Sequence, residues 1–201
     1  MELFDNNEER LSIDLQDSNI SYVPHFLSSE VANSAFDILL DELEWRQHTI
    51  KMFGKSLPQP RQTALYGIND QSYTYSNLTL NPLNFTSKLL EIHQKLKELT
   101  KINFTHCLAN LYRDGNDSMG WHADDEKELG ENPVIASVSL GVARRFQLKH
   151  KHDSNLKYQL DLEHGSLLLM KGTTQHFWKH QLPKTKKPIS PRINLTFRTL
   201  F

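Results

Sequence analysis

An α+β fold, with helices that precede a β-rich half, is the class that this sequence predicts, and three observations predict it. Two stretches of the N-terminal part, about 1–103, have apolar residues at helical spacing. From about residue 104 onward, six short β-type runs alternate with turn signals, with no helical stretch between them. The 201 residues, 38% of them hydrophobic, suit one domain with its own core. We therefore expect a single domain over 1–201, with helices packed on one sheet of an antiparallel sandwich or jelly roll.

The N-terminal part is expected to contain the helices. Residues 1–19 are polar and predict a loose arm with at most one strand, and 21–27 are expected to be extended. Ser28 can cap a helix that continues to about residue 43, because apolar side chains then recur three or four positions apart. The same spacing predicts a second helix over 83–100.

Between the two helices, residues 45–52 have the composition of a strand. Phe53 and Gly54 mark a turn after it, and Pro58 and Pro60 predict an irregular return. We therefore expect a hairpin whose second arm is irregular.

The second part of the chain, about 104–201, is expected to form the sandwich. Its β-type runs are separated by turn signals such as Asp114-Gly115-Asn116 and His164-Gly165. Strands at this spacing are typical of antiparallel sandwiches and jelly rolls. The predicted strands are 107–112, 134–141, 144–150, 158–163, 166–171 and 192–201.

Charge and cysteine content exclude several classes of protein. The formal net charge is −1, so no global basic field indicates a nucleic-acid partner, although a local basic face is still compatible with one. The single cysteine, Cys107, excludes an intramolecular disulfide and favours a cytoplasmic protein, associated with the nucleoid if the source is bacterial. Neither a signal peptide nor an apolar run of 18 residues is visible, so we expect no membrane contact. A monomer is the default expectation.

A metal site is suggested by the spacing of His122 and Asp124. On an extended segment, residues i and i+2 project to the same side, so one imidazole and one carboxylate can meet at one ion. Two histidines and one carboxylate on one face of an octahedral metal are diagnostic of non-haem Fe(II) oxygenases, and His180 is the candidate third ligand. By itself the His-x-Asp pair is a weak signal, because such pairs often occur by chance in surface turns.

A strand near the C-terminus carries two arginines at even spacing. Arg192 and Arg198 share one face of the predicted strand with Asn194 and Thr196, and the other face is apolar. A guanidinium group matches carboxylate geometry and never loses its charge, so the two arginines can clamp a dicarboxylate. The alternative is a solvated sheet face on which the arginines have no ligand.

Four motifs, in order along the chain, resemble those of the AlkB family of nucleic-acid dealkylating dioxygenases. They are Asn110-x-Tyr112-x-x-Gly115, His122-x-Asp124, His180 and Arg192-x-Asn194-x-Thr196-Phe197-Arg198. The resemblance extends to 60–67 and 73–76, which look like the segment that lines the base pocket in this family, and it covers about 45–201. Met52-Phe53-Gly54-Lys55 resembles the hairpin of the members that repair duplex DNA, to which the similarity is greatest.

The resemblance implies a double-stranded β-helix, which is a jelly roll, and the cofactors Fe(II), 2-oxoglutarate and O₂. His122, Asp124 and His180 would bind Fe(II), and Arg198 would join them as a catalytic residue. The residues implied for 2-oxoglutarate are Arg192 with Tyr112 at the distal carboxylate, Arg198 with Asn110 at the carboxylate next to the keto group, and Asn194 and Thr196 beside them.

The substrate implied by the resemblance is alkylated DNA, with duplexes favoured and single strands also open. Bases of the 1-methyladenine and 3-methylcytosine type would lose the alkyl group as an aldehyde, while 2-oxoglutarate is converted to succinate. Because such lesions lie on the Watson–Crick edge, the nucleotide must leave the helix first. The residues expected to contact the substrate are Phe53, Arg61, Tyr73, Tyr75, Asp125 and Glu126.

Several of these residues have simpler alternative roles. Phe53 can wedge into the base stack, or it can fold back onto the core. Asp125 and Glu126 can recognise a cationic base, or they can belong to a solvated turn. The basic residues Arg144, Lys149, His150, Lys151 and His152 and the run 184–187 can contact phosphates, or they can be solvated.

Three other functions are compatible with parts of the pattern. The same fold and metal can act on RNA, protein side chains or a small molecule. A non-catalytic jelly-roll binding module is a second alternative, although all three candidate ligands and both arginines are present. A zinc hydrolase can use the same ligand set, but that function gives the arginine strand no purpose.

Overall fold

The structure is a computed structural model that describes residues 10–52, 55–75 and 78–201. Within these residues the largest sheet has eight strands, and it is antiparallel except where β5 meets β8 at one edge. Its strands, in spatial order, are β1 (Leu11–Ile13), β2 (Asn19–Val23), β14 (Leu167–Lys171), β11 (Ile135–Gly141), β16 (Arg192–Arg198), β9 (His106–Tyr112), β5 (Gln62–Gly67) and β8 (Leu83–Asn84).

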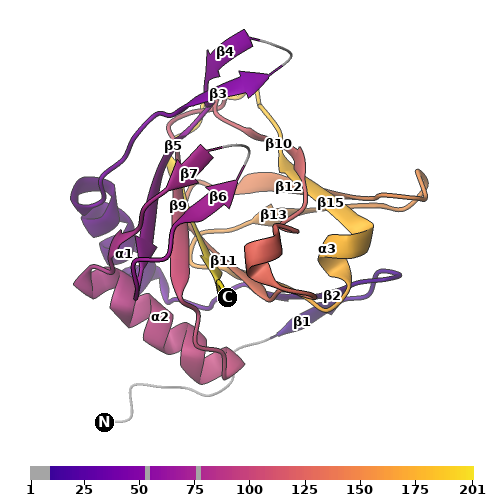
Figure 1. Ribbon diagram of the computed structural model, residues 1–201, viewed down its shortest axis with the longest axis horizontal. Helices are drawn as coiled ribbons and strands as arrows, with labels where there is room; N and C mark the ends of the chain where they lie inside the picture. Colours follow the sequence, from indigo (N-terminus) through magenta and orange to yellow (C-terminus); the bar gives the residue numbers. More distant parts are fainter. Residues whose placement is uncertain (1–9, 53–54, 76–77) are drawn as a thin grey trace.

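A second, smaller antiparallel sheet faces the inner side of the large one. Its described strands, in spatial order, are β10 (Met119–His122), β15 (Trp178–Leu182), β12 (Arg144–His150) and β13 (Lys157–Leu162). Apolar side chains from both sheets meet between them, among them Leu108, Leu168, Phe146 and Trp178. The two sheets therefore form the predicted jelly roll (Figure 1).

Two helices cover the outer side of the large sheet. They are α1 (Ser29–Glu42) and α2 (Ser87–Thr100), and in Figure 1 both lie on the side away from the small sheet. Ser28 caps α1, as predicted, by accepting a hydrogen bond from the Val31 amide. A second apolar cluster fills the space between these helices and the sheet, so helix packing on one sheet is confirmed.

The predicted start of the second helix is wrong by about one turn. Thr86 caps α2 at the Leu89 amide, so the helix begins at Ser87 rather than at residue 83. Leu83 instead pairs with Tyr66 at the edge of the large sheet. Leu83 fits helical spacing, but backbone pairing with β5 satisfies its polar groups, and only the tertiary structure supplies that partner.

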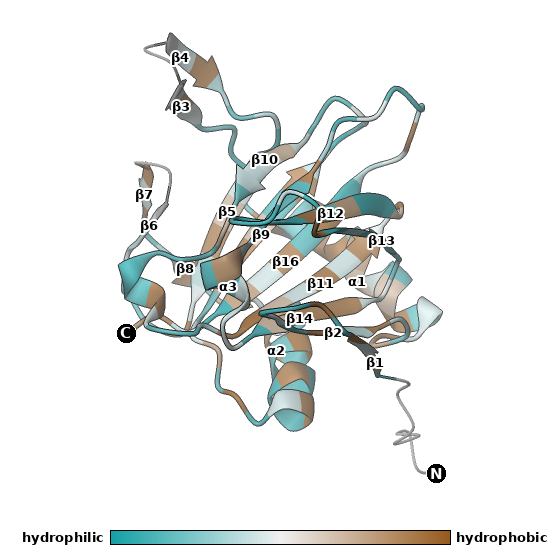
Figure 2. Ribbon diagram, turned by 90° about the vertical axis from the view of Figure 1, so that its right-hand side faces the viewer, coloured by the Kyte–Doolittle hydropathy of each residue, from teal (hydrophilic) through white to brown (hydrophobic). Residues whose placement is uncertain are grey.

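Two hairpins stand at the same end of the molecule as β10 (Figures 1 and 2). The first joins β3 (Thr49–Met52) to β4 (Lys55–Pro58), and the second joins β6 (Tyr73–Tyr75) to β7 (Leu78–Leu80). The return of the first hairpin is a regular strand, so the prediction of an irregular second arm is wrong for residues 55–58. Pro58 is tolerated because it is the last residue of a two-stranded ribbon, where its missing amide costs least.

The central strands β9 and β16 are buried along their whole length. Helices cover one face of these strands and the small sheet covers the other, so polar residues on either face are shielded from water. Figure 2 shows apolar residues concentrated in the strands and hydrophilic residues in the connecting loops. In the described part of the chain, no helix combines the length and the hydropathy that crossing a membrane would need.

Candidate active site

Three candidate metal ligands meet at one end of the jelly roll. His122 ends β10 and is the register partner of His180 on β15, while Asp124 lies in the loop just after β10. One ligand atom from each residue lies within 4.8 Å of the others. Pairing of β10 with β15 therefore brings together residues that are 58 positions apart in the sequence.

The hydrogen bonds of His122 leave one ring nitrogen free for a metal. Its Nδ1 lies 2.9 Å from the carbonyl oxygen of Gly120. A carbonyl can only accept, so Nδ1 carries the proton and Nε2 keeps its lone pair. Donation from the second ring nitrogen to a carbonyl is the usual way in which proteins orient a metal-binding histidine.

The protonation states at this cluster suit a metal. Burial, together with the neighbouring His122, lowers the pKa of His180 to about 3, so the ring is neutral at pH 7. Burial opposes ionisation of Asp124, but the cationic Arg198 and the two histidines outweigh it and lower the pKa to about 2. Metal binding requires neutral imidazole and ionised carboxylate, and both forms are present without any need to release protons.

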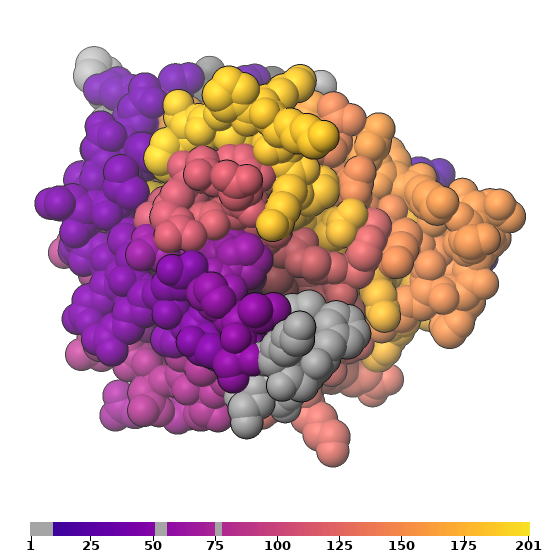
Figure 3. Space-filling view, turned by 90° about the horizontal axis from the view of Figure 1, so that it is seen from above, coloured from indigo at the N-terminus to yellow at the C-terminus, as the bar shows by residue number. Residues whose placement is uncertain are grey.

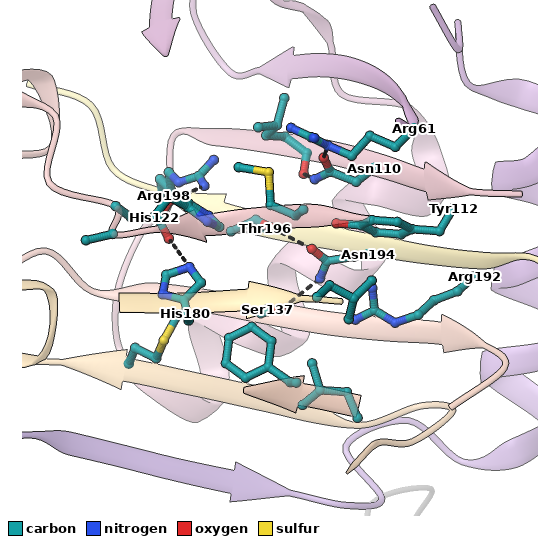
Figure 4. A pocket seen from close by; sticks show the side chains of 18 of the residues that line it. Arg61, Asn110, Tyr112, His122, Ser137, His180, Arg192, Asn194, Thr196 and Arg198 are labelled. Carbon is teal, nitrogen blue, oxygen red and sulfur yellow. Dashed lines mark hydrogen bonds and ion pairs between the residues drawn. The ribbon is translucent and has the colours of Figure 1, made fainter. Parts of the chain in front are cut away.

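A cavity of about 160 Å³ extends from this cluster between the two sheets. Liquid water occupies about 30 Å³ per molecule, so the cavity has room for about five waters, which is more than a single ion needs. Figure 4 shows His122, His180 and Arg198 at one end of the cavity, and Tyr112 and Arg192 at the other. The cavity therefore suits a small organic molecule that reaches from the metal cluster to Arg192.

The far end of the cavity is built by the register of three strands. Arg192 on β16 is the partner of Tyr112 on β9, and its guanidinium lies over the Tyr112 ring, 5.4 Å from the ring centroid. Arg192 Nη2 donates to the hydroxyl of Ser139 on β11 at 2.9 Å. Burial lowers the pKa of Arg192 to about 10, which still leaves the group charged at pH 7.

Two arginines have donors that no described residue satisfies. Arg198 uses Nη2 to bond Asp124 at 2.7 Å, but its Nε and Nη1 are buried with no hydrogen-bond partner. Arg192 Nε is in the same situation. Buried donors without partners cost about 1–3 kcal/mol each, and more when charged. Two guanidinium groups with buried free donors, at opposite ends of one cavity, fit a ligand with two carboxylates.

Polar side chains between the two arginines form a short chain of hydrogen bonds. Asn194 donates to the hydroxyl of Ser137 at 2.7 Å and accepts from the hydroxyl of Thr196 at 3.0 Å. Asn110 accepts from Arg61 Nε at 2.7 Å, and both of these side chains are buried. Arg61 thus lies in the cavity wall rather than on the surface.

The residues predicted to contact the substrate lie in different places. Tyr73 and Glu126 line the cavity, and the guanidinium of Arg198 lies 5.3 Å from the Tyr73 ring centroid. Burial, reinforced by Asp124, raises the pKa of Glu126. Asp125 does not line the cavity, and its carboxylate accepts from Lys151 at 3.1 Å. Phe53 lies outside the described residues, as does the side chain of Tyr75.

Some residues that shape the site were missed by sequence reasoning. Gln175, on the short helix α3 (Thr174–Phe177), is buried and accepts from the backbone amide of Asp124 at 2.9 Å. No local signal identifies this glutamine. Ser137 and Ser139 are different, because their alternation along a predicted strand could have revealed a second polar face of the cavity.

The prediction that Arg144 can contact phosphates is wrong. The side chain is buried and donates to the backbone carbonyls of Asp114, Asp117 and Pro183. Its guanidinium also lies 5.9 Å from the centroid of the Tyr112 ring, on which Arg192 is packed as well. Arg144 therefore supports the loops and the tyrosine at the far end of the cavity.

Comparison with known proteins identifies the class first. A family model described as the 2OG-Fe(II) oxygenase superfamily matches residues 19–198, nearly the whole chain. The solved structure of OsALKBH1 superposes with a TM-score of 0.67 over 94% of this chain and 100% of that one, and at 16% identity it supports the fold alone. The protein is thus an iron- and 2-oxoglutarate-dependent dioxygenase, whose cofactors are Fe(II), 2-oxoglutarate and O₂.

Sequence relatives then give the family. Alpha-ketoglutarate-dependent dioxygenase alkB homolog 3 of Bos taurus is 39% identical over 193 residues, which cover 92% of this chain and 67% of that protein. DNA oxidative demethylase ALKBH2 of Homo sapiens is 40% identical over 191 residues, which cover 90% of this chain and 72% of that protein. The chain belongs to the AlkB family.

Proposed function

We propose that this protein removes alkyl groups oxidatively from DNA bases of the 1-methyladenine and 3-methylcytosine type. The observation that carries the proposal is a single cavity with a two-histidine, one-carboxylate cluster at one end and a buried arginine at the other, next to Tyr73 and Glu126. The relatives named DNA oxidative demethylase support DNA as the substrate.

Within this proposal, His122, Asp124 and His180 hold the iron. When bound, Fe(II) with O₂ and 2-oxoglutarate supplies hydroxylation of the N-alkyl carbon, coupled to decarboxylation of 2-oxoglutarate to succinate. The hydroxylated alkyl group then leaves the base nitrogen as an aldehyde. Gln175 holds the Asp124 backbone, and so fixes the carboxylate relative to the histidines.

The two arginines bind the carboxylates of 2-oxoglutarate. Arg192, packed on Tyr112, takes the distal carboxylate through its unsatisfied Nε. Arg198 uses its unsatisfied Nε and Nη1 for the carboxylate next to the keto group, while Nη2 keeps Asp124 ionised. Asn110, Asn194 and Thr196 line the space between them and orient the acid through hydrogen bonds.

Residues that line the same cavity close to Arg198 receive the flipped base. Glu126 is a buried carboxylate with a raised pKa beside Tyr73, and a base made cationic by methylation would favour its ionised form. We assign Tyr75 and the His122 ring to the two faces of the base. Because Asp125 is bonded to Lys151 outside the cavity, we assign it to supporting the loop rather than to contacting the base.

We also infer that the protein acts as a monomer of one domain over 1–201, that it favours duplex DNA and that it is cytoplasmic. Phe53, which lies between β3 and β4 in the sequence, is the proposed wedge that fills the stack when a base leaves it. The buried, unpaired Cys107 is compatible with a reducing compartment.

A repair assay tests the proposed function. The protein is incubated with Fe(II), 2-oxoglutarate and an oligonucleotide that carries one 1-methyladenine, either single-stranded or paired, and the readouts are formaldehyde, succinate and restored adenine. We expect all three products, with Asp124→Ala inactive. Phe53→Ala should slow repair of the duplex more than of the single strand. Succinate without restored adenine on either form would refute the DNA substrate but not the dioxygenase class.

A further inference from the structure

A second cavity, of about 1100 Å³, lies on the outer face of the small sheet, and we call it the outer groove. Its walls come from β10, β12, β13 and β15 and from the turn between β12 and β13. In Figures 1 and 3 the orange segment that contains this turn projects from the side of the molecule. The outer groove shares no lining residue with the active-site cavity, so it is a separate feature.

Three lysines lie side by side across the floor of the outer groove. Lys149 on β12 is in register with Lys179 on β15 and with Lys157 on β13. Neighbouring strands are about 4.8 Å apart, so these charges are adjacent on the sheet surface. Like charges directly opposite each other destabilise a sheet. This lysine row therefore has an energetic cost that an anionic ligand would offset.

The charge of the lysine row is not balanced within the groove. Four positions away along the same strands, Arg145 is paired with Asp161 at 2.5 Å, so the positive charge of that arginine on the same sheet face is neutralised. The described residues that line the outer groove include no aspartate or glutamate, and of its further basic side chains Lys151 is paired with Asp125 outside the lining. In a chain of net charge −1, this is a local site for a polyanion.

An exposed tryptophan stands at the edge of the outer groove that is nearest the active site. Trp121 is 37% exposed, and Lys149 Nζ lies 4.4 Å from the centroid of its ring. Trp121 lines the outer groove, whereas His122, the next residue on β10, lines the active-site cavity. Aromatic rings beside lysines are the usual platform on which proteins stack the bases of single-stranded nucleic acid.

We propose that the outer groove binds an unpaired stretch of DNA that flanks the nucleotide held in the active site. The lysine row contacts consecutive phosphates, and Trp121 stacks a base. Paired bases have no free face for Trp121, so the site selects a single strand, a bubble or an overhang. This inference rests on the proposed function for its choice of DNA, and it adds a binding mode for unpaired strands to the wedge proposed for duplexes.

Binding of an undamaged, fluorescently labelled single strand of 20 nucleotides tests the outer groove directly, without any catalytic step. We expect Lys179→Glu to raise the Kd about tenfold and Trp121→Ala to raise it about fivefold. Lys179→Ala should also reduce the slope of log K against log salt by about one.

Lys97→Glu is the matched control, because it changes the net charge equally but lies on α2, beyond the large sheet. It should leave the Kd unchanged, and thermal unfolding should show that every variant is folded. Two outcomes would overturn the proposal that the outer groove binds DNA. One is that Lys179→Glu and Trp121→Ala bind the long strand as tightly as the unaltered protein does. The other is that the unaltered protein does not bind the long strand. Weakened binding by these variants, with no repair by the unaltered protein, would refute the proposed function and leave the groove supported.

Discussion

Both faces of β16 are buried, but one face is apolar and the other carries charged side chains. On the helix side, Ile193, Leu195 and Phe197 are fully buried in an apolar cluster. On the cavity side, Arg192 and Arg198 are also buried, but they retain donors that no described residue satisfies. One strand thus combines a face that stabilises the fold with a face that is energetically costly and chemically useful. Burial alone does not distinguish a core from a binding site, whereas unsatisfied polar atoms do.

The largest expected difference between the two faces comes from truncating one residue on each. Phe197→Ala should destabilise the protein by about 3–5 kcal/mol, because it leaves a cavity among the helices. Arg192→Met replaces a buried charge with an apolar chain of similar length, so it should change stability by less than about 1.5 kcal/mol or increase it. Urea unfolding measures the change in stability of both variants, and succinate formation at saturating iron measures their activity.

Activity should show the opposite order. Arg192→Met should nearly abolish turnover at ordinary 2-oxoglutarate concentrations, while Phe197→Ala should keep turnover per folded molecule at a temperature where it is folded. If Arg192→Met destabilised the protein as much as Phe197→Ala does, the cavity side of β16 would be ordinary core. A conservative Phe197→Leu variant guards against complete loss of folding by the alanine substitution.

A smaller effect is expected for a residue that touches the cavity side only indirectly. Gln175→Leu removes the acceptor of the Asp124 amide and should weaken metal affinity about 10–100-fold, with a smaller loss of stability. Titration with Co(II), followed by its absorption spectrum, measures this without catalysis. Gln181→Leu is a control on the outer face of the small sheet, where Gln181 bonds Gln147. Equal metal affinities for the two variants would show that Gln175 has no positioning role.

Acid should affect the cavity side in a way that reports on His180. In the metal-free protein the pKa of His180 is lowered to about 3, whereas in the unfolded chain it is about 6.5. The unfolded state therefore binds more protons below pH 6.5, and stability should fall as the pH drops from 6.5 towards 3. The maximum slope for one such group is about 1.4 kcal/mol per pH unit. Asp124 adds to this loss only between about pH 4 and pH 2.

Urea unfolding in the presence of a chelator measures this dependence. His180→Asn should make the fall between pH 6.5 and 3 shallower, because one titrating group is gone, while His122, His93 and His106, whose pKa values burial also lowers, still contribute. Phe197→Leu should lower stability by a similar amount at every pH, because nothing that titrates has been removed. A pH profile of His180→Asn parallel to that of the unaltered protein would show that His180 titrates normally in the folded state.

Much of the cavity side was visible in the sequence because it depends on local periodicity. The alternation from Arg192 to Arg198 and the spacing of His122 and Asp124 need no long-range information. Runs of β-type residues also predicted β9, β11 and β12 to within about one residue. Of the residues to which the resemblance implied roles, those whose side chains are described line one cavity, except Asp125, and their roles remain proposals.

What the sequence could not supply was the set of partners across the sheets. Strand β5 begins directly after Arg61 and pairs with β9. Pro58 and Pro60, which precede it in the sequence, suggested irregular structure instead. The α2 start, the burial of Arg144 among three carbonyls and the bond from Gln175 to Asp124 all depend on which distant segments meet. Such contacts depend on which strands pair and in what register, and local sequence patterns do not reveal that register.

The sequence by itself determined the fold class, the order of helices before strands, and the residue types able to hold iron and a dicarboxylate. Local periodicity depends only on residues that are close together in the sequence, so it can be recognised without knowledge of the tertiary structure. Only the tertiary structure decided that β10 pairs with β15 to join His122 to His180, and that three lysines from separate strands form one row. These decisions follow from strand register, which apolar packing on the opposite faces of the same strands holds in place.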